Sequence, residues 1–269
     1  MPKSPAIEAS WYSYPQYYDL AFRSETRGEA DFIEAACRKY CPFAVKRLFE
    51  PACGTGRLVT ELAARGYQVT GLDLSPDALG YLRRRLARRR LKAILSRGDM
   101  AEFHLAPPVD AAFCTFNSFR HLLTEPEARG HLECVAESLR PGGIYILGLH
   151  LLPSDASDEC IERWSERHGG TQVGVTLRVV HTDRRRRIET LRVNLLVRSS
   201  GKELRLRDEF QLRRYSPGQF RKLLSSVHSL ELLDVYDFWY EIDNPQTFED
   251  DMSDTVFILQ KRSKGVARA

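Results

Sequence analysis

The sequence predicts an α/β protein whose main sheet is largely parallel and carries helices on both faces, with an inserted antiparallel β meander. Two observations carry this prediction. From residue 45 to residue 149, short apolar runs alternate with helical patterns, and such alternation implies crossover connections between parallel strands. From residue 173 to residue 212, apolar residues alternate with smaller or polar ones, which is typical of antiparallel strands with one wet face.

The main sheet is expected to begin with a strand–turn–helix–strand unit: a strand over 45–50 that ends in Glu50, the turn Gly54-Thr55-Gly56, a helix over 57–65 and a strand over 68–73 that ends in Asp73. Glycines let the backbone pass close to a ligand. An acid about 20 residues beyond such a turn is suited to hold ribose hydroxyls. This unit therefore predicts a site for a nucleotide-type cofactor.

The later elements are marked by signals at their ends. Helix starts are expected where a capping residue precedes a proline or opens a capping box, at Ser75-Pro76, Thr124-Glu125-Pro126-Glu127 and Ser216-Pro217. The remaining strands of the main sheet are expected over 92–97, 109–116, 144–149, 230–240 and 255–261, with the turn Pro141-Gly142-Gly143 before the third of them. The turns of the meander are expected at 183–186 and 199–202.

These elements divide the chain into regions: an N-terminal helical lid (1–43), a Rossmann-like cofactor domain (44–150 and 216–262), an antiparallel β insertion (151–215) and a disordered tail (263–269). The lid begins with aromatic residues and continues with a helical pattern over 30–40. The insertion is expected either to roof a substrate site or to form the interface of a homodimer. The sequence leaves both interpretations open.

Composition excludes several classes of protein. A chain of 269 residues is long enough for one large domain with an insertion. No apolar run approaches the roughly 18 residues that a membrane span requires, and the first residues lack the apolar core of a signal peptide. Six scattered cysteines without a C-x-x-C pair predict free thiols in a reducing cytoplasm. A net charge of +4 is too mild to indicate nucleic-acid binding.

Two residues near the glycine turn discriminate between cofactor classes. A dinucleotide fingerprint has a third small residue for close helix packing, but Val59 stands at that position. Glu50, just before the turn, would repel a pyrophosphate and suits a cationic amino group. S-adenosylmethionine (SAM) carries such an ammonium and no phosphate. The segment 50–56 resembles the first motif of the class I SAM-dependent methyltransferases, so that SAM is the expected cofactor and S-adenosylhomocysteine its product.

The resemblance extends over about 17–262 and implies a seven-stranded Rossmann-like methyltransferase sheet, with the meander inserted after the fifth strand. Leu139-Arg140-Pro141-Gly142-Gly143 matches the family's turn before that strand. The resemblance also implies cofactor contacts: Ala52, Cys53, Gly54 and Gly56 around the methionine part, Asp73 at the ribose hydroxyls, Leu74, Asp99 and Met100 at the adenine, and Asn117 and Ser118 at the methionine end.

A narrower resemblance concerns the acceptor. Tyr17-Tyr18-Asp19, Asn117-Ser118 and the meander look like the small-molecule branch of the family, which includes amino-sugar N-methyltransferases and glycine N-methyltransferases. In that branch an N-terminal tyrosine packs over the cofactor. We therefore expect Tyr18 at the cofactor and Tyr17 as a catalytic candidate, with ordinary core packing as the competing interpretation for both.

Methyl transfer from a sulfonium is an in-line displacement, in which the reacting atoms approach to about 3–3.5 Å. A general base helps by about 10²–10⁴-fold where the nucleophile starts protonated. Ligands of open α/β sheets bind beyond the carboxyl ends of the strands, where His150 follows the strand at 144–149. We expect His150 to be the base; a hydrogen bond to a loop is the competing interpretation. We expect the acceptor to be bound by Arg120, His121 and Trp239. The competing interpretation is that these side chains are solvated at the surface.

The predicted function is transfer of a methyl group to nitrogen or oxygen of a small molecule. The alternatives are a methyltransferase acting on RNA or protein, a SAM-binding protein without turnover and a nicotinamide-dependent oxidoreductase. Asn117-Ser118-Phe119-Arg120 stands where base N-methyltransferases carry an N/D-P-P-Y/F tetrad, and Glu50 with Val59 opposes a nicotinamide cofactor. The histidines and cysteines show no metal-ligand spacing, so no metal is expected.

Overall fold

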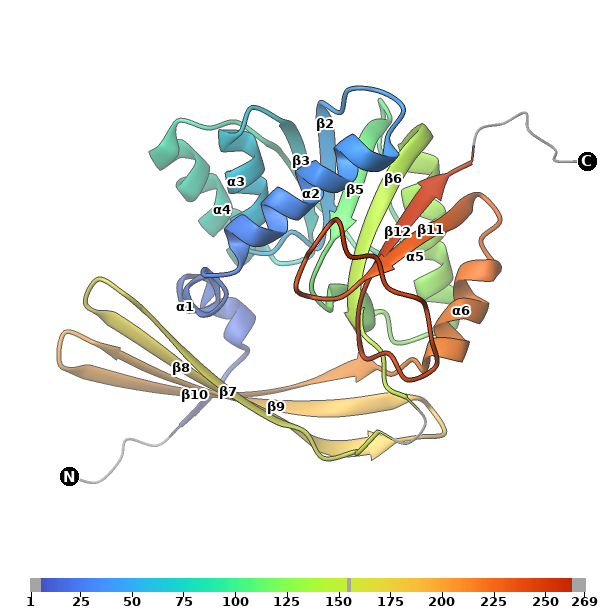
Figure 1. Ribbon diagram of the computed structural model, residues 1–269. Coiled ribbons are helices and arrows are strands. Elements are labelled where there is room, and N and C mark those ends of the chain that lie inside the picture. Colours follow the sequence, from blue (N-terminus) through green and yellow to red (C-terminus); the bar gives the residue numbers. More distant parts are fainter. Residues whose placement is uncertain (1–5, 154–155, 263–269) are drawn as a thin grey trace, which may run out of the picture.

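The chain folds into two β-sheets with helices around and between them (Figure 1). The computed structural model describes residues 6–153 and 156–262. A seven-stranded main sheet forms the upper layer in Figure 1, and a five-stranded insert sheet lies below it. The tail at 263–269, predicted to be disordered, lies outside the described residues. None of the described helices is long and apolar enough to cross a membrane.

The main sheet has the strand order β11-β12-β6-β5-β2-β3-β4. Its strands are β2 (Arg47–Pro51), β3 (Gln68–Asp73), β4 (Ile94–Arg97), β5 (Val109–Cys114), β6 (Leu139–His150), β11 (Leu230–Tyr236) and β12 (Asp254–Lys261). β4, β3, β2, β5 and β6 are parallel, and β12 runs antiparallel to both of its neighbours. The predicted seven-stranded Rossmann-like sheet is confirmed, and its order reverses at β2, where such sheets bind ligands.

Helices cover both faces of the main sheet. α2 (Thr26–Tyr40), α3 (Arg57–Ala64) and α4 (Pro76–Arg89) pack on one face, and α5 (Glu125–Ser138) and α6 (Pro217–Ser225) pack on the other. Strand β6 contributes side chains to the hydrophobic cores on both faces of the sheet, because successive side chains of a strand point to opposite faces. Ile144 and Ile146 join the α2–α4 core, whereas Tyr145 and Leu147 join the α5–α6 core.

The predicted helix caps are confirmed. Ser75, Thr124 and Ser216 each accept a backbone N–H of the first helical turn, and the latter two form complete capping boxes. The residues of the predicted turn, 141–143, lie within strand β6, which starts at Leu139. The register of β6 against β5 shifts between Leu139 and Ile144. Gly142 has a φ of 77°, so that the chain bends at the expected place without leaving the sheet.

The insert sheet has the order β1-β10-β9-β8-β7. Its strands are β1 (Ile7–Glu8), β7 (Ile161–His168), β8 (Thr171–Asp183), β9 (Ile188–Ser199) and β10 (Lys202–Arg213). β8 to β10 are antiparallel, as predicted for the meander; β7 adds an antiparallel edge strand and β1 a parallel one. The sequence does not predict β7, because Glu162 and Glu166 replace the apolar residues that would reveal its alternation.

The residues expected to form one lid divide between the two sheets. α2 packs on the main sheet, whereas η1 (Trp11–Ser13) and α1 (Pro15–Ala21) pack on the inner face of the insert sheet through Trp11, Leu20 and Phe22. Asp19 is buried and accepts a hydrogen bond from Arg85 of α4. This ion pair holds α1 against α4, so that the N-terminal segment lies between the two sheets (Figure 1).

Candidate active site

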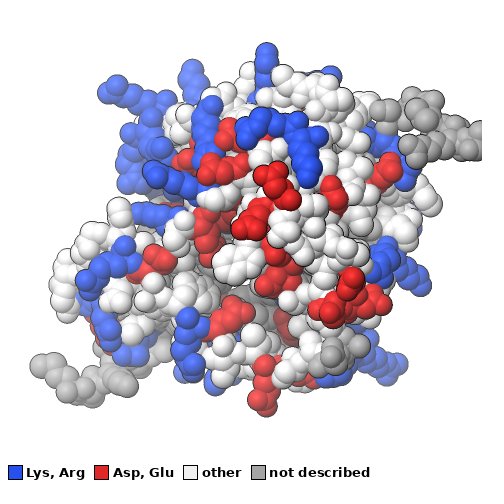
Figure 2. All heavy atoms as spheres, in the orientation of Figure 1, with Lys and Arg blue, Asp and Glu red and all other residues white. Residues whose placement is uncertain are grey.

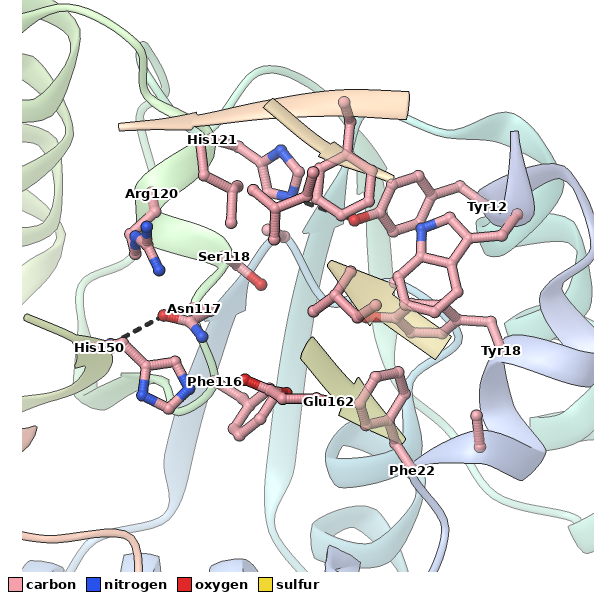
Figure 3. Close-up of a pocket in the computed structure, with 18 of the residues that line it drawn as sticks. Tyr12, Tyr18, Phe22, Phe116, Asn117, Ser118, Arg120, His121, His150 and Glu162 are labelled. Atoms are coloured by element: carbon pink, nitrogen blue, oxygen red, sulfur yellow. Dashed lines mark hydrogen bonds between the residues drawn. The ribbon is translucent and has the colours of Figure 1, made fainter. Parts of the chain in front are cut away.

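A cavity of about 1190 Å³ lies between the carboxyl ends of the main-sheet strands and the inner face of the insert sheet (Figure 3). The segments that follow β2 to β6 line one side of it, and η1, α1 and the strands β7 to β10 line the other. Figure 2 shows acidic side chains gathered around the hollow on this face of the molecule. Sites for one small molecule usually measure about 300–1,000 Å³. The cavity therefore has room for a cofactor and a second small molecule.

The turn after β2 combines left-handed backbone with close packing. Ala52, Gly54 and Gly56 have φ values of 55°, 52° and 68°. A Cβ at Gly56 would overlap Leu82 of α4, so glycine is required where α3 starts. Ala52 and Gly54 line the cavity, whereas Gly56 and the buried Cys53 lie behind the lining. The turn thus borders the cavity through Ala52, Gly54 and Thr55.

Asp73 ends β3 and lines the cavity next to this turn. Its Oδ2 accepts the Gly54 N–H at 2.7 Å, and its Oδ1 accepts the Ser75 N–H at 2.8 Å. Burial raises the pKa of the Asp73 carboxyl, and the backbone N–H groups of Ser75, Gly54 and Leu74 oppose that shift. A carboxylate has about four acceptor positions, so each oxygen can accept one more hydrogen bond. Asp73 can therefore bind two neighbouring hydroxyls while it holds the turn.

The segment after β4 brings Asp99 and Met100 to the cavity, together with Leu74 from the end of β3. Leu74 is 63% exposed, which is unusual for a large apolar side chain. Asp99 Oδ1 accepts the Ala101 N–H at 2.8 Å, and Met100 O accepts from Nδ1 of the buried His131 at 2.8 Å. These segments thus bring two apolar side chains and one carboxylate to the cavity.

Glu50 lies outside the cavity lining, at the end of β2. The residue is 8% exposed, and its Oε2 is buried without a hydrogen-bond partner in the described part of the chain. Burial raises the pKa of the Glu50 carboxyl well above its ordinary value; Arg57 opposes this shift, and the charges of Glu29 and Asp73 add to it. A buried, unpartnered carboxyl is costly unless a donor or a cation comes near.

The ends of β5 and β6 are locked together at the cavity. Asn117 Oδ1 accepts the His150 N–H at 2.8 Å (Figure 3), and the Asn117 N–H donates to Gly148 O at 3.0 Å. Ser118, the next residue, also lines the cavity. His150 Nδ1 lies 2.7 Å from Asp254 Oδ1, and this contact lowers the pKa of the Asp254 carboxyl. In a neutral His150 ring whose Nδ1–H donates to Asp254, Nε2 is an acceptor.

A tyrosine–histidine pair joins η1 to η2 (Ser118–His121) within the cavity. The Tyr12 hydroxyl lies 3.1 Å from His121 Nε2, and Phe210 packs near both rings. His121 is exposed to the cavity, and desolvation by the surrounding protein, together with the charge of Arg120, lowers the pKa of His121 to about 4. The sequence does not single out Tyr12, because no spacing tells which of the N-terminal aromatic residues faces the cavity.

Arg120, expected to bind an anionic group of the acceptor, has a partner within the fold. Its guanidinium forms a salt bridge with Glu189 of β9, and its Nε donates to Arg213 O at 2.9 Å. The side chains of Arg120 and Glu189 are 4% and 6% exposed. Arg120 lines the cavity, but Glu189, which the sequence does not single out, already compensates its charge.

Tyr17 and Trp239 lie outside the cavity lining. Tyr17 stacks on Tyr14 with ring centroids 6.2 Å apart, whereas Tyr18 lines the cavity and packs on Trp11 at 5.0 Å. Burial raises the pKa of Tyr18 to about 12. Trp239 follows β11 and is 82% exposed. Over the described ranges, no group of three or more His, Cys, Asp or Glu side chains is arranged to hold a metal ion.

Known proteins resemble this chain in sequence and in fold. A family model described as a methyltransferase domain matches residues 49–143. The chain is 31% identical over 185 residues to the dTDP-3-amino-3,6-dideoxy-alpha-D-glucopyranose N,N-dimethyltransferase of Streptomyces fradiae, covering 68% of this chain and 69% of the relative. It is 30% identical over 191 residues to the dTDP-3-amino-3,4,6-trideoxy-alpha-D-glucopyranose N,N-dimethyltransferase of Streptomyces venezuelae, covering 70% and 77%. Its fold matches a SAM-bound amino pentose methyltransferase from Micromonospora echinaspora with a TM-score of 0.69 at 21% identity, over 97% of this chain and 100% of that one.

Proposed function

Since the chain belongs to the SAM-dependent methyltransferase family of these two sugar N,N-dimethyltransferases, we propose that it methylates the amine of a sugar carried on a nucleoside diphosphate. The chain is a SAM-dependent methyltransferase that acts on a small molecule. One structural observation supports the proposal of an amino-sugar acceptor more than the others. The cavity continues from Asp73 on the main sheet to the inner face of the insert sheet, with polar groups on both sides.

We assign the main-sheet side of the cavity to the cofactor. The Asp73 carboxylate, held by backbone N–H groups, has acceptor positions left for ribose hydroxyls. Leu74 and Met100 suit the faces of an adenine ring. The orphaned Glu50 oxygen at the end of β2 favours a cationic group at the adjoining turn. When bound, SAM supplies an electrophilic methyl group on a sulfonium centre.

Residues near the ends of β5 and β6 are assigned to the acceptor. An amine attacks only in its uncharged form, so a group that takes up its proton assists the reaction. His150 offers Nε2 for this role, because Asp254 holds the proton on Nδ1. The Tyr12 hydroxyl and the uncharged His121 offer hydrogen bonds to the sugar. Tyr17 and Trp239 have no part in this proposal, because both lie outside the cavity lining.

The test is methylation of dTDP-3-amino-3,6-dideoxyglucose with SAM, followed by mass spectrometry. We expect one and then two methyl groups on nitrogen, with S-adenosylhomocysteine formed in equal amount. The same nucleotide sugar with a hydroxyl at C3 is the control. Enzyme that binds SAM but leaves amino-sugar nucleotides unmethylated would refute the amine acceptor, and methylation of the control instead would move the reaction to oxygen.

A variant tests the base within the same assay. His150→Ala is expected to lower kcat by at least about tenfold, since general bases contribute about 10²–10⁴-fold. The KD for SAM should stay unchanged, because the assigned cofactor contacts lie after β2, β3 and β4. A wild-type kcat at saturating acceptor would remove His150 from this role.

We further propose that the insert sheet forms a homodimer interface and that the protein works in the cytoplasm. The edge strand β7 supports the first proposal, because it exposes 55% of Ile161. The free, buried thiols of Cys37, Cys53 and Cys114 support the second. Light scattering tests the dimer: Ile161→Lys should shift the mass to that of one chain, and a monomeric wild-type protein would contradict it.

A further inference from the structure

Strand β7 presents carboxylates to the cavity. Trp164 fixes the orientation of the strand, because its Nε1 donates to Ala21 O of α1 at 2.9 Å. Side chains alternate along a strand, so Glu162 and Glu166, two residues to either side, share the face of Trp164. The Ser24 hydroxyl donates to Glu166 Oε1 at 2.8 Å, which agrees with that orientation. Glu162 therefore reaches the cavity from the wall that faces the main sheet.

Glu162 has no cationic partner within residues 6–153 and 156–262. The Cys160 thiol lies 3.6 Å from Glu162 Oε1, within hydrogen-bond range for sulfur, but a thiol is a weak donor. By contrast, Glu189 of the same cavity is neutralised by Arg120. Most of the acceptor capacity of the Glu162 carboxylate is therefore free for a ligand.

Aromatic rings line the same cavity as this carboxylate. Phe22 and Phe116 line the cavity as Glu162 does (Figure 3), and their two rings pack against each other with centroids 5.9 Å apart. Trp164 adds a third ring, 5.6 Å from Phe22. Ring faces attract cations, and a carboxylate gives a cation both charge and a hydrogen-bond acceptor. A neutral hydroxyl would gain much less from these surroundings.

We propose that Glu162 binds the ammonium form of the acceptor's amine and so selects an amine over a hydroxyl. The inference rests on the proposed function, because it requires an amine acceptor. Charge-assisted hydrogen bonds are roughly twice as strong as neutral ones, so the carboxylate holds the nitrogen in place before its proton leaves. Glu162 orients the nitrogen and forms no bond to the methyl group.

Calorimetric titration of the S-adenosylhomocysteine-bound enzyme tests this assignment without turnover. The probes are dTDP-3-amino-3,6-dideoxyglucose and the same nucleotide sugar with a hydroxyl at C3. Wild-type enzyme should bind the amine about 10- to 100-fold more tightly, the range expected for a hydrogen bond to a charged group, and Glu162→Gln should abolish that preference. Glu166→Gln is the matched control on the same face of β7 and should keep it. An unchanged KD for S-adenosylhomocysteine shows that each variant is folded.

The other outcomes separate this inference from the proposed function. A preference for the amine that survives in Glu162→Gln overturns the role of Glu162, while the proposed function stands. Weaker binding of SAM but not of S-adenosylhomocysteine in Glu162→Gln would show that the carboxylate serves the sulfonium, which also overturns the assignment. Wild-type enzyme that binds S-adenosylhomocysteine but neither sugar overturns the proposed function and this inference with it.

Discussion

His131 is expected to make the enzyme lose stability in acid. The residue lies on α5 and is fully buried. Its Nδ1–H donates to Met100 O at 2.8 Å, and its Nε2 accepts from the Tyr145 hydroxyl at 2.7 Å, so the neutral ring satisfies both neighbours. A second ring proton would face a hydroxyl that is already donating. Burial accordingly lowers the pKa of His131 to about 4.

The sign of the effect follows from proton uptake. An unfolded histidine titrates near pH 6.5, whereas the folded protein keeps His131 neutral down to about pH 4. Between these values the unfolded chain binds a proton that the folded chain excludes, so stability is full above pH 6.5 and falls as the pH drops. The difference between the two pKa values corresponds to at most about 3.4 kcal/mol, of which about 2 kcal/mol is lost by pH 5.

Urea unfolding at pH 8, 6 and 5 measures this loss. His131→Gln retains a donor and an acceptor but has no titratable group, so its free energy of unfolding should fall less between pH 8 and pH 5, by about 2 kcal/mol. His104→Gln, at an exposed position, is the matched control for the loss of a histidine. If wild type and His131→Gln lose stability equally over this range, His131 is not held neutral in the folded protein.

Further predictions concern the cofactor, a buried ion pair and a close approach of strands. Asp73→Ala should weaken SAM binding by about 100-fold or more in calorimetry, as expected for lost hydrogen bonds to a charged group, and an unchanged KD would refute the ribose assignment. Arg120→Met should cost about 3–5 kcal/mol in urea unfolding, because Glu189 stays buried without its partner, and adding Glu189→Met should recover part of the loss. Gly148→Ala should cost about 1–3 kcal/mol, because a Cβ there would overlap the Thr115 carbonyl oxygen; a melting temperature equal to wild type would contradict that packing.

The main-sheet side of the cavity could be predicted from the sequence because its signals are local. Gly54 and Asp73 belong to one strand–turn–helix–strand unit, and the carboxyl ends of neighbouring parallel strands must meet at one edge of a sheet. The same rule brings Met100 and Asn117 to that edge from the segments after β4 and β5. Periodicity and turn chemistry indicate this shared edge for Gly54, Asp73 and Asn117, whereas Met100 was singled out by the resemblance to the methyltransferase family.

The acceptor side depends on contacts that no local pattern contains. Tyr12 meets His121 across 109 positions of the chain, and Arg120 meets Glu189 across 69. Sequence spacing does not encode such pairs, because they arise only when the insert sheet folds back over the main sheet. The same limit applies to Trp239. Its place near a strand end indicated a binding role, but in the loop after β11 its side chain is exposed to solvent.

The cofactor side and the acceptor side of the cavity differ in how they tolerate substitution. Asp73 is tied to the fold, since its carboxylate also accepts the Gly54 and Ser75 N–H groups, so that its loss disturbs the turn as well as any ligand. Glu162 stands on the edge strand β7 and has no ion pair in the described part of the chain, so its replacement leaves the backbone ladder intact. Single substitutions on β7 can therefore change the choice of acceptor while the cofactor side remains folded.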